Sequence, residues 1–155
     1  MTGVRALVVA LDVARSRRDD AGLALAQMLR RQAGAQGQMD QLRSYAAETE
    51  ARWSVAAQSS ANPQIVGHYY QFIERLEQTI SLQQGVIADL QSQSQSARQV
   101  LIQAEVRVAG LNKLLEQRRS LLARADARRE QKSSDEFAAR QFHNRALGLD
   151  RMENA

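Results

Sequence analysis

Apolar residues recur at alternating spacings of four and three through most of this 155-residue chain. One such series runs from Leu7 to Ala56, and 12 of its 15 positions are apolar. A second runs from Tyr69 to Arg129, with 14 of its 18 positions apolar. A period of 3.5 residues held over this many heptads is typical of a left-handed coiled coil rather than of a helix on a globular core.

Composition supports the same conclusion. Ala, Gln, Arg and Leu make up 80 of the 155 residues, and all four are strong helix formers. Aromatic residues amount to only 5%, so there is little bulky material with which to build a sandwich, an α/β domain or a deep catalytic pocket. The chain is therefore expected to be helical throughout.

The single proline, Pro63, follows Asn62 and interrupts the two apolar series. Proline disfavours helix at the preceding residue and can itself begin a helix. We therefore predict an all-α fold, an antiparallel coiled-coil hairpin of two long helices in which the second is longer and overhangs the first. The predicted single domain, 1–155, consists of a helix over about 5–57, a loop over about 58–64, a helix over about 65–145 and a disordered tail over 146–155.

Folding the chain back at this break pairs the two series in one register. Trp53 then lies opposite Tyr69, and Leu7 lies opposite Leu115. Four polar seam positions are each expected to face an apolar residue across the seam: Arg18, Gln32, Gln83 and Ser94. Pairing is predicted to end near Leu115, which leaves the rest of the second helix without an intrachain partner.

Residues capable of catalysis or metal binding are sparse. His68 and His143 are far apart, and neither has another His or Cys at ligand spacing. Adjacent carboxylates such as Asp19 and Asp20 point in different directions on a helix. There is no cysteine and no glycine-rich phosphate loop. We predict a protein that is not an enzyme and that uses neither a metal nor a cofactor.

The net charge of +4 has a local origin. Between Lys113 and Arg145 there are nine basic and five acidic residues, so the unpaired end of the second helix is the basic end. Apolar residues also remain there: Leu121, Leu122, Phe137, Phe142 and Leu147. This combination favours docking into a protein. Nucleic acid would suit the charge but not the apolar residues, and a helix lying on a membrane surface stays open.

The apolar run near the N-terminus, Ala6 to Leu11, is too short for a secretory signal. No run approaches the length of a membrane span. The sequence therefore predicts a soluble intracellular protein.

The aromatic residues gather around the predicted loop. Trp53 and Tyr69 belong to the seam, whereas Tyr45, Tyr70 and Phe72 fall outside it. Two interpretations are equally open for the second group. These side chains form an exposed patch that marks a partner site, or the seam widens there to a third position.

Two short motifs resemble a known family. The segment 70–80, YQFIERLEQTI, resembles the Tyr-x-x-Phe-Ile-x-x-Leu-Glu-x-x-Ile stretch of the FliJ family, flagellar type III export proteins, with Tyr69 or Tyr70 as the tyrosine. The segment 135–140, DEFAAR, resembles the Asp-Glu-Phe-Ala-x-Arg element near that family's C-terminus. The resemblance extends over nearly the whole chain.

This resemblance implies a stalk-like coiled coil of the bacterial flagellum export apparatus. Such a protein would promote assembly and activity of the export ATPase FliI hexamer, link it to the export gate protein FlhA, and interact with export chaperones. It would be cytoplasmic, would reach the cytoplasmic face of the inner membrane only through its partners, and would not bind nucleic acid.

The resemblance also implies two sets of contact residues. The positions matching the family's gate-binding strip are Gln38, Leu42, Tyr45, Phe72 and Leu76, although Leu42 and Leu76 also belong to the predicted seam. The residues expected to bind the ATPase ring are Leu7, Leu11, Arg124, Arg128, Asp135, Glu136, Phe137 and Arg140. Thr49, Thr79 and Gln83 depart from the family's residues on the strip.

Three other functions remain alternatives at this point. The chain could be the equivalent stalk protein of a virulence type III secretion system. It could be a basic coiled coil that binds nucleic acid, or a scaffold that associates with itself.

Overall fold

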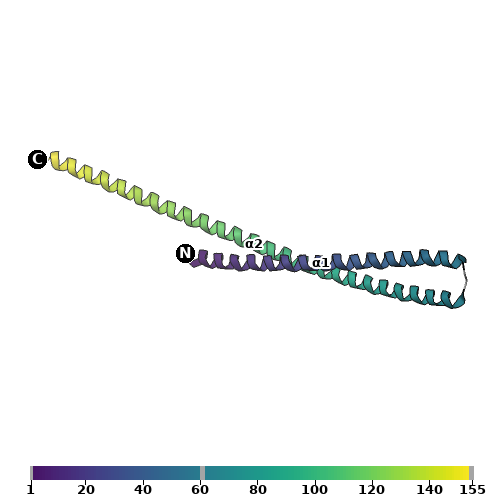
Figure 1. Cartoon of the computed structure of the whole chain (residues 1–155). Coiled ribbons are helices and arrows are strands. Elements are labelled where there is room, and N and C mark those ends of the chain that lie inside the picture. Colours follow the sequence, from purple (N-terminus) through teal and green to yellow (C-terminus); the bar gives the residue numbers. More distant parts are fainter. Residues whose placement is uncertain (1, 60–61, 154–155) are drawn as a thin grey trace. The chain divides into compact units, whose positions relative to one another are not determined.

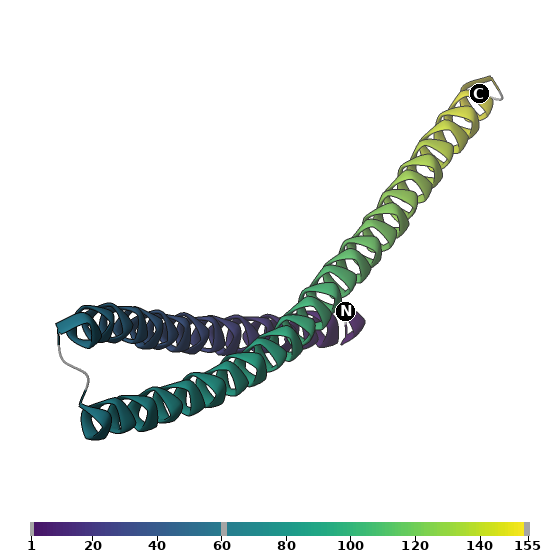
Figure 2. The ribbon, with the colours of Figure 1, turned by 90° about the vertical axis from the view of Figure 1, so that its right-hand side faces the viewer.

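Two long helices make up the computed structural model, which describes residues 2–59 and 62–153 (Figures 1 and 2). Helix α1 spans Thr2–Ser59, and α2 spans Pro63–Glu153. The described residues contain no strand. The two helices pack against each other in opposite chain directions, so the predicted all-α hairpin with a longer second helix is confirmed.

Both helices extend beyond the limits read from the sequence. The clearest difference is at the end of α2, which continues as far as Glu153 through residues expected to form a disordered tail. No proline lies in that stretch, and Gly148 alone costs only about 1 kcal/mol of helix stability. Arg151 in the last turn also complements the helix dipole. Residues 154 and 155 lie outside the described part.

The chain divides into two compact units. Unit 1 comprises Met1–Val13 with Arg107–Ala155, and unit 2 comprises Ala14–Val106. Each unit contains part of both helices, because α1 and α2 run without interruption from one unit into the other.

A seam of small and medium side chains holds the two helices of unit 2 together. The buried residues include Ala21, Ala35, Met39 and Leu76, and Met39 is the most completely enclosed. They recur at the predicted spacing of three and four, with exposed residues between them. Each helix thus buries one narrow stripe, as expected for a coiled coil.

Polar residues at the predicted seam positions, each expected to face an apolar residue, form hydrogen bonds or ion pairs with other polar groups. Ser94 Oγ donates a hydrogen bond to Gln32 Oε1 at 3.0 Å, and Gln83 Nε2 donates to the Ala35 carbonyl oxygen at 2.9 Å. Arg18 turns to its neighbour Asp19 in an ion pair of 3.0 Å. A glutamine side chain is long enough to reach about one turn along the seam. Pairing each residue with the one directly opposite therefore does not identify its hydrogen-bond partner.

Aromatic rings close the loop end of unit 2. The Trp53 and Tyr69 rings contact each other with their centroids 4.5 Å apart, which confirms this predicted pair. Desolvation raises the pKa of Tyr69 above its ordinary value of 10.0, and Glu50 and Tyr70 add to the effect, so the phenol stays protonated at neutral pH.

The first turn of α2 is fixed by a side-chain cap. Asn62 Oδ1 accepts a hydrogen bond from the backbone N–H of Gln64 at 3.1 Å, and the Asn62 carbonyl accepts one from the N–H of Val66. Pro63 then occupies the first helical position, where its missing N–H costs nothing.

Unit 1 contains a shorter stretch of paired helix. Leu11, Val108 and Leu115 are buried, and from Glu116 to Glu153 every described residue is exposed. The pairing of the two helices extends to Gly3, which lies close to the Arg118 side chain. A Cβ atom added to Gly3 would be 3.0 Å from Arg118 Nη1. The remainder of α2 has no intrachain partner, as the sequence predicted.

Replacing Asn62 with alanine should remove the cap of α2 and lower the free energy of unfolding by about 1 kcal/mol. Chemical denaturation followed by circular dichroism measures this change. Gln64→Ala is the matched control, because Gln64 contributes only its backbone N–H to the cap. Equal stability of Asn62→Ala and the wild type would contradict the role of the cap.

Candidate functional site

The five residues of the predicted gate strip lie on the two facing helices of unit 2. Gln38, Leu42 and Tyr45 follow one another on α1 at spacings of four and three, which places them along one side of the helix. Phe72 and Leu76 lie one turn apart on α2. The hairpin therefore brings together two halves of a strip that are far apart in the sequence.

Direct contact between Tyr45 and Phe72 joins the two halves. Their rings meet edge to face, with centroids 5.9 Å apart and an interplanar angle of 80°. Tyr45 nevertheless remains 50% exposed and Phe72 38% exposed. The two rings are therefore partly exposed and also pack on each other between the helices, so the structure combines features of both interpretations.

Leu42 and Leu76 occupy different depths beside these rings. Leu76 is buried in the seam, with 8% of its surface exposed, and Leu42 is half-buried. Their assignment to the seam is therefore correct, and Leu76 offers almost no surface to a partner.

A shallow hollow of about 440 Å³ lies along the α1 half of the strip. It is lined by Gln38, Gln41, Leu42, Tyr45 and Gln83. Gln83 Nε2 donates to Gln38 Oε1 at 3.1 Å, so this side chain from α2 holds one strip residue in place. Sequence reasoning missed Gln41, although its spacing of three from Gln38 and four from Tyr45 places it on the same side of α1.

The predicted ring-binding set falls into two groups within unit 1. Leu11 is buried in the seam, with only 3% of its surface exposed, and Leu7 is half-buried. Leu11 therefore presents little surface to a partner, and the ring contact expected of both leucines stays a prediction. Both belong to the predicted apolar series, and that is why the short paired stretch buries them.

The six α2 members of the set are all exposed: Arg124, Arg128, Asp135, Glu136, Phe137 and Arg140. Spacings of four and seven place Arg124, Arg128 and Asp135 on one side of the helix. Phe137 and Arg140 lie on another side, and Phe137 is 64% exposed. Gln131 Nε2 donates to Asp135 Oδ1 at 3.3 Å, which restrains that carboxylate.

Among residues 2–59 and 62–153, no group of three or more histidines, cysteines or carboxylates is arranged to hold a metal ion. Neither described helix has an apolar stretch suited to crossing a membrane.

Comparison with known families gives one match. The family model described as flagellar FliJ protein matches residues 4–147, which includes both helices, the gate strip and most of the exposed end of α2. This chain belongs to the FliJ family. Searches of curated proteins and of solved structures returned no match.

Membership of the FliJ family places the chain among proteins of flagellar type III export. FliJ proteins are components of the export apparatus, so membership of the family implies that this chain associates with that apparatus in general. The helical hairpin agrees with the coiled-coil character of FliJ proteins.

The Tyr45 and Phe72 rings should contribute jointly to stability. A double-mutant cycle with Tyr45→Ala, Phe72→Ala and the double variant should give a coupling free energy of about 0.5–1.5 kcal/mol, as expected for an edge-to-face pair. Chemical denaturation supplies the four stabilities. A parallel cycle with Tyr45→Ala and Tyr70→Ala should give no coupling, and additivity of Tyr45 and Phe72 would contradict the contact.

Proposed function

We propose that this chain is a non-enzymatic component of the flagellar export apparatus that promotes assembly and activity of the FliI ATPase ring and links it to the export gate protein FlhA. The observation that carries this proposal is the presence of two exposed surfaces made of different residues, one in each unit. The gate strip belongs to unit 2, and the unpaired end of α2 belongs to unit 1. A protein that connects two partners needs such separate surfaces.

The unpaired end of α2 is the proposed ring-binding surface. Its basic side chains alternate with large exposed apolar ones, including Phe137 and Phe142. Burial of such aromatic rings supplies much of the affinity of protein interfaces, whereas the charges orient the encounter. We retain the six exposed α2 residues of the predicted set as contacts and assign Leu7 and Leu11 to supporting the paired part of unit 1.

The gate strip is the proposed FlhA-binding surface. Tyr45 and Phe72 form an exposed aromatic pair, and Gln38 and Gln41 add amide groups beside it. An apolar centre with polar groups at its edge is the usual composition of a transient interface. Export chaperones are further proposed partners, and these contacts would keep the chain at the cytoplasmic face of the inner membrane.

If the ring surface is correct, adding this chain to purified cognate FliI should stimulate ATP hydrolysis. The double variant Phe137→Ala/Phe142→Ala should lose most of that stimulation, because both rings are exposed and their removal leaves the fold unchanged. Phosphate release measures the rate. Leu82→Ala is the matched control, since Leu82 is equally exposed but lies in unit 2.

Absence of both binding and stimulation by the wild-type chain would refute the ring-binding proposal. Binding to duplex DNA that falls steeply with salt and persists in the double phenylalanine variant would instead support a nucleic-acid function. Sedimentation at several protein concentrations detects self-association, the scaffold alternative.

If the gate surface is correct, Tyr45→Ala should weaken binding to detergent-solubilised FlhA by about tenfold, because it removes half of the aromatic pair. Val55→Ala is the control, since Val55 is an exposed apolar residue of unit 2 outside both the strip and the aromatic group. Surface plasmon resonance gives both affinities. Equal losses in the two variants would show that the strip has no special role.

A further inference from the structure

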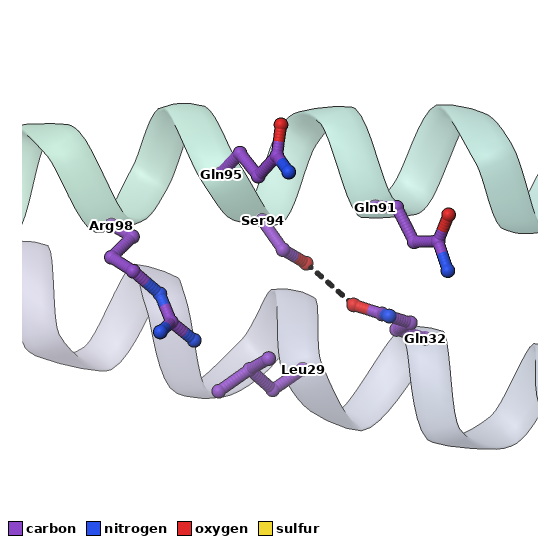
Figure 3. A pocket seen from close by; sticks show the side chains of 6 residues that line it. All are labelled: Leu29, Gln32, Gln91, Ser94, Gln95 and Arg98. Atoms are coloured by element: carbon purple, nitrogen blue, oxygen red, sulfur yellow. Dashed lines mark hydrogen bonds between the residues drawn. The ribbon is translucent and has the colours of Figure 1, made fainter.

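A second hollow of unit 2 lies outside the gate strip. It has a volume of about 580 Å³ and is bounded by six side chains of the two helices: Leu29, Gln32, Gln91, Ser94, Gln95 and Arg98. Figure 3 shows Arg98 extending from α2 towards α1, next to Leu29. None of these residues belongs to the two surfaces already discussed.

Hydrogen bonding within the hollow leaves donors available. Ser94 Oγ donates to Gln32 Oε1 at 3.0 Å, and this bond occupies the carbonyl end of the Gln32 amide (Figure 3). The NH₂ end of that amide has no acceptor among the described residues. Arg98 likewise forms no ion pair within the described part of the chain, so its guanidinium retains its donors for a ligand.

The sequence around the hollow carries more positive than negative charge. On α1 the stretch 21–39 contains Arg30 and Arg31 but neither Asp nor Glu, and on α2 the stretch 90–104 contains Arg98 and again no acid. Acidic residues occur immediately outside these limits, at Asp20, Asp40, Asp89 and Glu105. In the register that places Trp53 opposite Tyr69, Asp89 lies level with Ala33, so the middle of the hairpin has three arginines (Arg30, Arg31 and Arg98) and one acid and is a positive belt on balance.

We propose that this hollow binds a carboxylate side chain from an acidic segment of a partner protein. The Arg98 guanidinium would pair with the carboxylate in a two-pronged contact, and the free NH₂ of Gln32 would donate to the same group. Leu29, which is 40% exposed, offers an apolar contact beside it. The ligand is accordingly a peptide segment with an acidic residue about one helical turn from an apolar one.

A protein carboxylate fits this hollow better than nucleic acid does. Nucleic-acid binding depends on several cations that follow successive phosphates, but a single arginine faces this hollow. Arg30 and Arg31 are not among its lining residues. Leu29 and the glutamine amides also match the mixed polar and apolar surface of a peptide.

The test uses a fluorescein-labelled helical peptide with Glu and Leu four residues apart, and an identical peptide in which Gln replaces Glu. The wild-type chain should bind the Glu peptide more tightly than the Gln peptide by fluorescence anisotropy. Arg98→Gln should weaken Glu-peptide binding about tenfold, as loss of a charge-assisted contact would. Arg30→Gln makes the same charge change in the same belt outside the hollow and should change affinity less than about twofold.

A second measurement locates the peptide. The side-chain NH₂ signals of Gln32 and the Nε–H signal of Arg98 should shift in ¹⁵N NMR spectra on addition of the Glu peptide, and Leu29→Ala should reduce its affinity. Equal affinities for the two peptides, or equal losses in Arg98→Gln and Arg30→Gln, would overturn the proposal. The proposal would also be overturned if duplex DNA or anionic vesicles bound more tightly than the Glu peptide and shifted the Arg98 signal.

Discussion

Packing between two helices along a single narrow seam is the interaction on which the rest of this structure depends. A hairpin of two helices has no third element to cover other faces, so each helix buries one stripe and exposes everything else. Met39 and the small alanines keep the helices close, and Trp53 with Tyr69 closes the loop end. Any function must then reside on the exposed flanks or on the unpaired end of α2.

Polar residues in the seam form hydrogen bonds between the two helices. Ser94 and Gln32 satisfy each other, and Gln83 bonds to α1 through both the Ala35 carbonyl and Gln38. No buried side-chain nitrogen or oxygen of the described residues lacks a partner. These bonds fix the register of the helices and give up some apolar burial. They also shape the two hollows, because Gln83 lines one and Gln32 with Ser94 lines the other.

The two-helix hairpin is consistent with membership of the FliJ family. FliJ proteins are components of an export apparatus. A hairpin of two helices can offer several separate contact surfaces at small cost in chain length. The aromatic strip of unit 2 and the basic end of α2 differ in chemistry, so each can recognise a different partner.

The sequence by itself determined the helical hairpin, the seam and the unpaired end of α2, because a 3.5-residue period encodes which side of each helix is buried. It also placed Tyr45, Tyr70 and Phe72 outside the seam. It did not determine the contact between Tyr45 and Phe72 or the bond between Ser94 and Gln32, because these depend on how far side chains reach across two helices, and only the tertiary structure decides that. The continuation of α2 to Glu153 is a local property of the chain, since no stop signal ends the helix there.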